Sequence, residues 1–124
     1  MVERELSPEA VAGLAELRRT CKATDALVLL ACYHLLLRRL GAAEDQVIGV
    51  MADTRGGRSA DAVGYHVATV PLRVPVEDAI GFDRLVARVT EAMVAGFEHG
   101  RAPFEAVAPP IPLARTMRRG GAPD

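Results

Sequence analysis

Aromatic residues are scarce in this sequence, which excludes a core built around large rings. Phe and Tyr together make up 4% of the 124 residues and Trp is absent, whereas 50% of the residues are hydrophobic. The interior must therefore consist mainly of Leu, Val and Ala. A chain of this length corresponds to one small domain or to part of a larger one.

Cysteine is also scarce, which argues against a disulfide framework. The two cysteines, Cys21 and Cys32, both fall in helical patterns, and small disulfide-stabilised domains carry more of them. We expect two reduced, mostly buried thiols. A metal site needs further ligands at close spacing, and the sequence offers none. We therefore predict no metal.

Neither an excess of charge nor a long apolar run is present. The net charge is −1 and both signs are mixed along the chain, so no nucleic-acid partner is predicted. The longest apolar stretch, Ala26 to Leu37, is interrupted only by His34, and it is far shorter than the roughly 20 residues of a membrane span. Met1 to Leu6 lacks the apolar core of a signal peptide. These features predict a cytoplasmic protein without a membrane segment.

Two helices are predicted first. Ser7 precedes Pro8 and Glu9, a combination typical of a helix start, and an apolar stripe follows at Ala10, Leu14, Leu17 and Cys21. The second helix begins at Thr24 and ends near Leu40. Because Ala26 to Leu37 is apolar nearly all round, we expect it to be buried on most sides and to be the most buried segment of the chain.

Two strands are predicted next. Gln46 to Ala52 reads as a buried strand, and Asp53 to Ser59 as a flexible loop. In Gly64 to Val76 the apolar and polar residues alternate, but the phase shifts upstream, so we expect a bulge near Thr69. One face of this second strand holds Val70, Leu72, Val74 and Val76, and the other holds Pro71, Arg73 and Pro75. The two prolines require an edge.

A third helix is predicted from Phe82 to about Glu98, with a short helix from Pro103. These elements indicate an α/β fold with a small sheet and helices packed on one face. We assign residues 1–108 to one folded unit. Residues 109–124, rich in Pro, Gly and Arg, are predicted to be a flexible tail.

The candidate catalytic residues give no complete site. Cys32 and His34 point about 200° apart on one helix, so they cannot form a nucleophile–base pair. His34 is interpreted as a hydrogen-bonded core residue, and His99 as a helix-terminal residue that interacts with the helix dipole. His66 could face a cavity and is the one polar candidate. No catalytic residue and no cofactor site are predicted from the residues alone.

Three segments resemble the condensation domain of nonribosomal peptide synthetases. The strand that ends in GVMADTR, at Arg55, follows a buried helix as in that family. Residues 63–73 resemble its motif (I/V)-G-x-F-V-N-T-x-x-x-R, with Gly64, Thr69 and Arg73 in place. Residues 99–105 resemble H-x-x-x-P-F-E, with His99, Pro103 and Phe104 in place. The resemblance runs from Leu6 to Ala108.

The chain departs from the family pattern in ways that bear on activity. Ala68 replaces the motif's Asn, His66 replaces its aromatic residue, and the catalytic H-H-x-x-x-D-G motif is absent from the sequence. The resemblance implies part of the C-terminal lobe of a chloramphenicol-acetyltransferase-like fold, in which the matched motif residues are structural. It also implies an N-terminal lobe or a carrier protein as partner in trans, the carrier protein holding the phosphopantetheine.

Two interpretations stay open. In the first, the chain is a fragment, a split half or a decayed remnant that serves as a scaffold without being catalytic alone. In the second, it is a small acyl-thioester-binding protein or acyltransferase with His66 or His99 as its polar centre. Because two strands make a poor sheet, we also expect a homo-oligomer that pairs through Tyr65–Val70 or through Gln46–Ala52. Arg73 is expected to bind a nearby acid such as Glu77 or Glu105.

Overall fold

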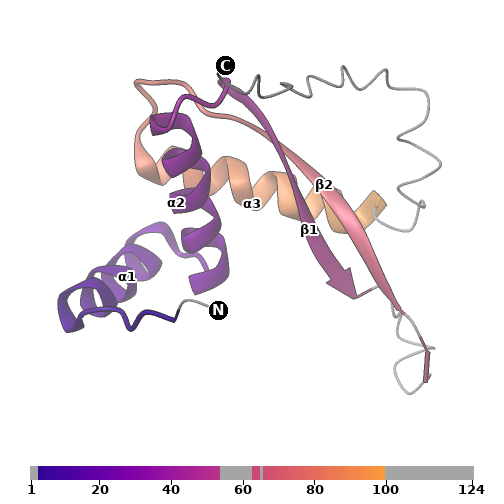
Figure 1. Ribbon diagram of the computed structural model, residues 1–124, viewed down its shortest axis with the longest axis horizontal. Coiled ribbons are helices and arrows are strands. Elements are labelled where there is room, and N and C mark those ends of the chain that lie inside the picture. The colour runs from indigo at the N-terminus through magenta and orange to yellow at the C-terminus, as the bar shows by residue number, and fades with distance from the viewer. Residues whose placement is uncertain (1–2, 54–62, 65, 100–124) are drawn as a thin grey trace, which may run out of the picture.

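The computed structural model describes residues 3–53, 63–64 and 66–99. Their elements are helix α1 (Pro8–Cys21), helix α2 (Asp25–Arg39), strand β1 (Asp45–Asp53), strand β2 (Val67–Pro75) and helix α3 (Phe82–His99), as Figure 1 shows. This order confirms the predicted sequence of the five main elements. The predicted short helix from Pro103 and the predicted tail, residues 109–124, lie outside the described residues.

The first two helices begin at the side chains predicted to cap them. Ser7 Oγ accepts a hydrogen bond from the Ala10 amide at 3.2 Å, and Thr24 Oγ1 accepts one from the Leu27 amide at 3.4 Å. Each hydroxyl satisfies an amide that has no partner within the first helical turn. Lys22 ends α1 in the left-handed conformation, with φ 51°. The chain thereby turns by 103° between the two helices.

The two strands form an antiparallel hairpin with an unbroken register. Pairing runs from Asp45 opposite Pro75 to Asp53 opposite Val67 without a skipped residue. The predicted bulge near Thr69 is therefore wrong, and the alternation that begins at Val67 continues to the end of β2. Asp53 is the last residue of β1 rather than part of a loop. The remainder of the predicted loop, residues 54–59, lies outside the described residues.

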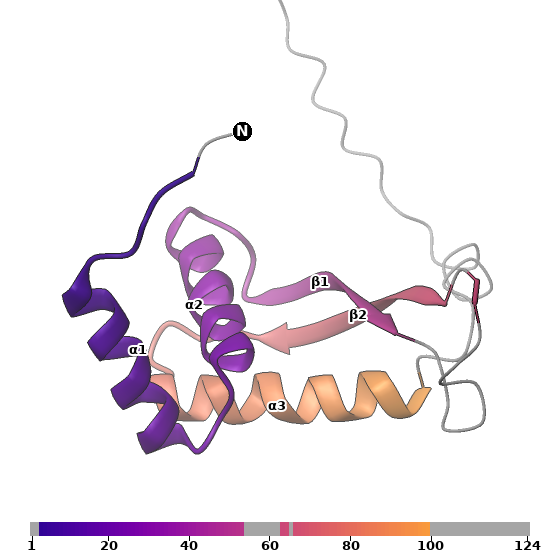
Figure 2. The same cartoon turned by 90° about the horizontal axis from the view of Figure 1, so that it is seen from below.

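Helices α2 and α3 pack on one face of this hairpin, which confirms the predicted α/β arrangement (Figure 2). The even-numbered residues of β2 point toward the helices and are buried, as their alternation predicted. Leu30 of α2 contacts both parts of the core. The larger core cluster consists of Ala31, Val74, Val76, Leu85, Val86 and Val89, and the smaller one of Ala52, Val70 and Leu72.

Helix α3 approaches β2 most closely at a glycine. A Cβ atom on Gly96 would lie 2.7 Å from Val70 Cγ1 and 2.8 Å from Leu72 Cδ2. Carbon atoms in ordinary contact are about 3.5–4.0 Å apart. Hydrogen therefore fits at this position where a methyl group does not, and the absence of a side chain lets the helix lie close against the strand.

Three predictions of burial are wrong. Helix α2 buries only Val28, Ala31 and His34, whereas Leu29, Tyr33 and Leu36 are about half exposed. Ala26 to Leu37 is therefore buried on one face rather than on most sides, because the described elements cover only that face. Cys32 is exposed and Cys21 is half-buried; both are free thiols, as predicted. Strand β1 is likewise covered on one face only, with Val47 63% and Met51 73% exposed.

The described residues hold neither a single membrane-spanning helix nor a cluster of metal-binding side chains. No single helix among them is long and apolar enough to span a membrane, and only α1 and α2 taken together, bent by 103°, reach the required length and composition. Within the same ranges, no three His, Cys, Asp or Glu side chains lie close enough together to hold a metal ion.

Candidate functional site

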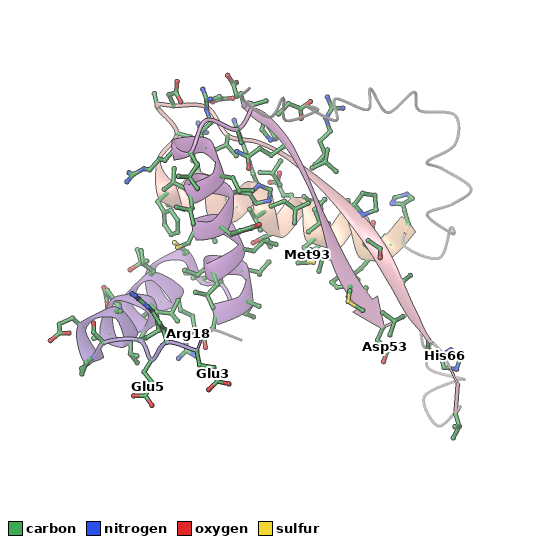
Figure 3. The ribbon with its side chains drawn as sticks, viewed as in Figure 1. Glu3, Glu5, Arg18, Asp53, His66 and Met93 are labelled. Carbon is green, nitrogen blue, oxygen red and sulfur yellow. The ribbon has the colours of Figure 1, made fainter. Side chains whose placement is uncertain are left out.

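The matched motif positions are distributed over the hairpin and the end of α3. Gly64, His66 and Thr69 lie at or near the start of β2, and Arg73 lies toward its other end. The contact of Gly96 with β2 carries the end of α3 toward the start of that strand, so His99 and His66 belong to the same end of the molecule (Figures 2 and 3). Arg55, Pro103 and Phe104 lie outside the described residues.

Arg73 binds Asp45 across the hairpin. Its Nε lies 2.8 Å from one carboxylate oxygen of Asp45 and its terminal nitrogen 2.7 Å from the other. This hydrogen-bonded guanidinium lowers the pKa of Asp45, and the carboxylate raises the pKa of Arg73. Both side chains are exposed on the face of the sheet that the helices leave open. The pair ties the two strands together.

The expected pairing of Arg73 with Glu77 is therefore wrong. Glu77 instead accepts a hydrogen bond from Arg88 at 3.1 Å, on the helix side of the hairpin. Glu105 lies outside the described residues. Asp45 is close because the register sets it opposite Pro75, two residues from Arg73. The structural role predicted for Arg73 agrees with the observed cross-strand pair.

His34 forms the one buried polar pair of the described core. Its side chain is inaccessible to solvent, and its Nδ1 lies 2.9 Å from Gln46 Oε1. The amide oxygen can only accept, so Nδ1 carries the proton in this pair. Burial lowers the pKa of His34, and the hydrogen bond to Gln46 opposes that shift. The prediction of a hydrogen-bonded core histidine is confirmed.

The other two histidines differ in their surroundings. At the last residue of α3, the Nδ1 atom of His99 lies 2.8 Å from the carbonyl oxygen of Ala95, four residues earlier. The imidazole thus caps a carbonyl of its own helix, which agrees with a helix-terminal role. His66 is half-buried beside Gly64, and no hydrogen bond joins it to a carboxylate among the described residues. Thr69 is exposed on the open face of the sheet.

These side chains form no catalytic constellation in the described part of the chain. A nucleophile needs a base within hydrogen-bond reach, and the base needs a group that orients it. His34 is buried, and within the described ranges neither His99 Nε2 nor His66 is hydrogen-bonded to a nucleophile or to an orienting carboxylate. The described portion of the site therefore has a structural role and does not supply a nucleophile with a base.

Three functional positions were missed from the sequence. Asp45 and Gln46 acquire their roles only through the hairpin register, which no local pattern fixes. Gly96 could have been identified, because it falls seven residues after Val89 on the apolar stripe of α3. A glycine on such a stripe indicates close approach of another backbone or side chain.

Comparison with known proteins identifies the family. The model of the condensation domain matches residues 2–120. N-(5-amino-5-carboxypentanoyl)-L-cysteinyl-D-valine synthase of Amycolatopsis lactamdurans is 33% identical over 119 residues, which are 95% of this chain and 3% of that protein. Malpibaldin synthetase of Mortierella alpina is 33% identical over 98 residues, 78% of this chain and 2% of that protein. The chain thus spans a small fraction of the length of these relatives.

Solved structures agree with the sequence matches. The first condensation domain of the calcium-dependent antibiotic synthetase, in complex with substrate analogue 3a, has a TM-score of 0.74 and 30% identity, covering 82% of this chain and 24% of that chain. The condensation domain of the monacolin K polyketide synthase MokA has a TM-score of 0.73 and 25% identity, with 84% and 24% covered. By family match, sequence identity and structural likeness, this chain belongs to the condensation-domain family.

Proposed function

We propose that this chain forms part of the C-terminal lobe of a nonribosomal-peptide-synthetase condensation domain. In this proposal it acts as a scaffold and interaction module for amide formation between carrier-bound substrates, and it is not catalytic alone. The observation that carries the proposal is that none of the three histidines is hydrogen-bonded to a nucleophile among the described residues. In addition, the sequence does not contain H-H-x-x-x-D-G.

The reaction of the family requires a group that manages one proton. The amine nitrogen of one substrate attacks the thioester carbonyl carbon of the other, and a C–N bond replaces the C–S bond. The thiol leaves on its carrier arm, and the attacking amine gives up a proton. An imidazole can assist only if the substrate can reach it. His34 is inaccessible. The Ala95 carbonyl holds the His99 ring through Nδ1, but no hydrogen bond joins its Nε2 to a nucleophile among the described residues.

His66 is the remaining imidazole, and its surroundings do not favour it as the base. A general base works best when a carboxylate or carbonyl holds its ring in one orientation. The described residues provide no such partner for His66. In this proposal the base comes from an N-terminal lobe that carries H-H-x-x-x-D-G, whether in the same polypeptide or in trans.

Reconstitution tests this proposal. The full chain is mixed with a separately expressed N-terminal condensation lobe carrying H-H-x-x-x-D-G and with two aminoacyl carrier proteins, and the dipeptidyl carrier protein is measured by mass spectrometry. We expect product only when both lobes are present. Replacing the second His of the partner's motif by Ala is the control, and it should abolish the product.

The same assay separates this proposal from a stand-alone acyltransferase. Product or thioester hydrolysis by the chain alone, lost in His66→Ala and retained in His99→Ala, would overturn the scaffold role and favour the second interpretation. Failure of the mixture with the chain still folded, judged by circular dichroism, would also count against the proposal.

A further inference from the structure

The two outer edges of the hairpin differ in their capacity to pair with another strand. The Val76 amide donates to the Glu44 carbonyl at 2.7 Å, which continues the register beyond both strands. Backbone groups of successive residues in a strand point to opposite sides. The even-numbered residues of both strands therefore face each other, and the odd-numbered residues direct their backbone groups to the outer edges.

On the outer edge of β2, two of the odd-numbered positions are Pro71 and Pro75. Proline has no amide hydrogen, so this edge cannot form a continuous ladder. On the outer edge of β1, all the odd-numbered residues, Asp45, Val47, Gly49, Met51 and Asp53, have amide hydrogens. The described sheet places no third strand against either edge. Strand β1 thus offers the edge that can be extended.

The side chains along β1 also favour extension. Val47 is 63% exposed and Met51 is 73% exposed, both on the open face of the sheet. On the helix face, Ile48 and Val50 are only half-buried. Exposed edges of this kind are sites of strand addition in proteins. A strand that pairs with β1 would cover apolar surface on both faces of the sheet.

We propose that the outer edge of β1 pairs antiparallel with β1 of a second copy of this chain, about a two-fold axis at Gly49. This register sets Val47 of each copy opposite Met51 of the other, so the exposed apolar side chains meet. Shifting the register by two residues sets Val47 against Gly49 or Asp53 and loses that contact. The result is one continuous four-stranded sheet in place of a marginal two-stranded one.

The charged residues at the two ends of β1 also affect the stability of this pairing. Asp45 of one copy comes opposite Asp53 of the other, and like charges in this position are destabilising. Arg73 lies on the same face and already holds Asp45 in a two-point contact. Its guanidinium reduces the repulsion. Because salt screens exposed charges, the dimer is expected to hold or tighten, not dissociate, as sodium chloride is raised.

This inference concerns the chain by itself and does not depend on the scaffold role proposed above. Sedimentation equilibrium of the full chain at micromolar concentration should give twice the 13.2 kDa chain mass. Val47→Pro removes one outward amide of β1 and should give the monomer mass. The matched control is Thr69→Pro, which removes an outward amide of β2 and should leave the dimer intact.

A second variant guards against misfolding of the first. Val47→Lys places a charge on an exposed position without touching the β1–β2 hydrogen bonds, and it should also give a folded monomer by circular dichroism. A wild-type chain of monomer mass would overturn the proposal. So would dissociation by Thr69→Pro with retention of the dimer in both Val47 variants, since that would place the interface on β2.

Cross-linking tests the register. In a background with Cys21→Ala and Cys32→Ser, Val47→Cys and Met51→Cys are introduced together. Directly opposed residues have Cα atoms about 4.5–5.5 Å apart, within the range of a disulfide. The same two positions in one chain are about 13 Å apart and cannot bridge. We expect oxidised dimers on a non-reducing gel; their absence from a chain that sediments as a dimer would refute the Gly49 axis.

Discussion

Replacing Gly96 by alanine should destabilise the protein even though alanine favours helices. In an exposed helix interior, Gly→Ala is worth about 0.8–1.0 kcal/mol of stabilisation. At Gly96, however, the new Cβ would lie 2.7 Å from Val70 Cγ1 and 2.8 Å from Leu72 Cδ2. Both neighbours are buried in the core, so neither can move away freely. Overpacking of a core costs about 1–3 kcal/mol, which gives a net destabilisation of about 0–2 kcal/mol.

Gly13 in α1 is the matched control. It lies within a helix, and no atom lies within 4 Å of its hypothetical Cβ. Gly13→Ala should therefore stabilise the chain by about 0.8–1.0 kcal/mol through helix propensity alone. The difference between the two variants isolates the overpacking cost of about 1–3 kcal/mol.

Urea and thermal unfolding, followed by far-ultraviolet circular dichroism at one protein concentration, measure this difference. For a chain of this size, each kcal/mol corresponds to a change in Tm of roughly 3–6 °C. If Gly96→Ala raises Tm as much as Gly13→Ala does, then α3 does not rest on β2 at this point. The close approach of helix and strand described above would then be wrong.

Three further predictions test the core and the cross-strand pair. The pKa of His34 is lowered by burial, so the unfolded chain binds this proton more readily; stability should fall as pH drops below about 6.5, and His34→Leu should remove that part of the pH dependence in urea titrations. Leu30→Asp should lower soluble expression more than Leu36→Asp, because the half-buried Leu30 packs against both core clusters and a charge there opposes a total stability of only about 5–15 kcal/mol, whereas Leu36 lies on the exposed face. Arg73→Lys should leave the fold intact and lower Tm only slightly, less so at high salt, since the Asp45 pair is exposed; a folded variant that loses carrier-protein binding would refute the structural role of Arg73.

The elements fixed by local interactions were predictable from the sequence. Ser7 and Thr24 begin their helices because a hydroxyl satisfies an amide three residues later, which is a purely local event. The alternation in β2 predicted which of its residues would be buried, because period and direction follow from the element itself. Together these gave the α/β class and the side of the sheet that the helices cover.

The remaining features depend on contacts between elements. Arg73 was expected to bind an acid nearby in sequence, but the register brought Asp45 beside it. The bulge near Thr69 was inferred because Val67 is apolar but out of phase with Val70. The unbroken register instead leaves Val67 on the open face of the sheet, 38% exposed. At the candidate site, the sequence identified His34 as a core residue, but only the fold shows that Gln46 is its partner.

Helix α2 shows that an apolar pattern does not by itself determine how much of a helix is buried. Its apolar residues on all sides indicated burial on all sides, and one face is buried against the core. Leu29, Tyr33 and Leu36 on the other face remain about half exposed. Full burial of a large apolar side chain is worth about 1.5–3 kcal/mol, so covering the exposed halves of three would add a few kcal/mol, a sizeable part of a typical domain stability. This face lies on the opposite side of α2 from the core, whereas the edge proposed for self-pairing belongs to β1. A partner lobe that covers α2 and a second copy that pairs with β1 therefore need not compete, and stabilisation by an added N-terminal lobe should persist in Val47→Lys, in which the β1 edge is blocked.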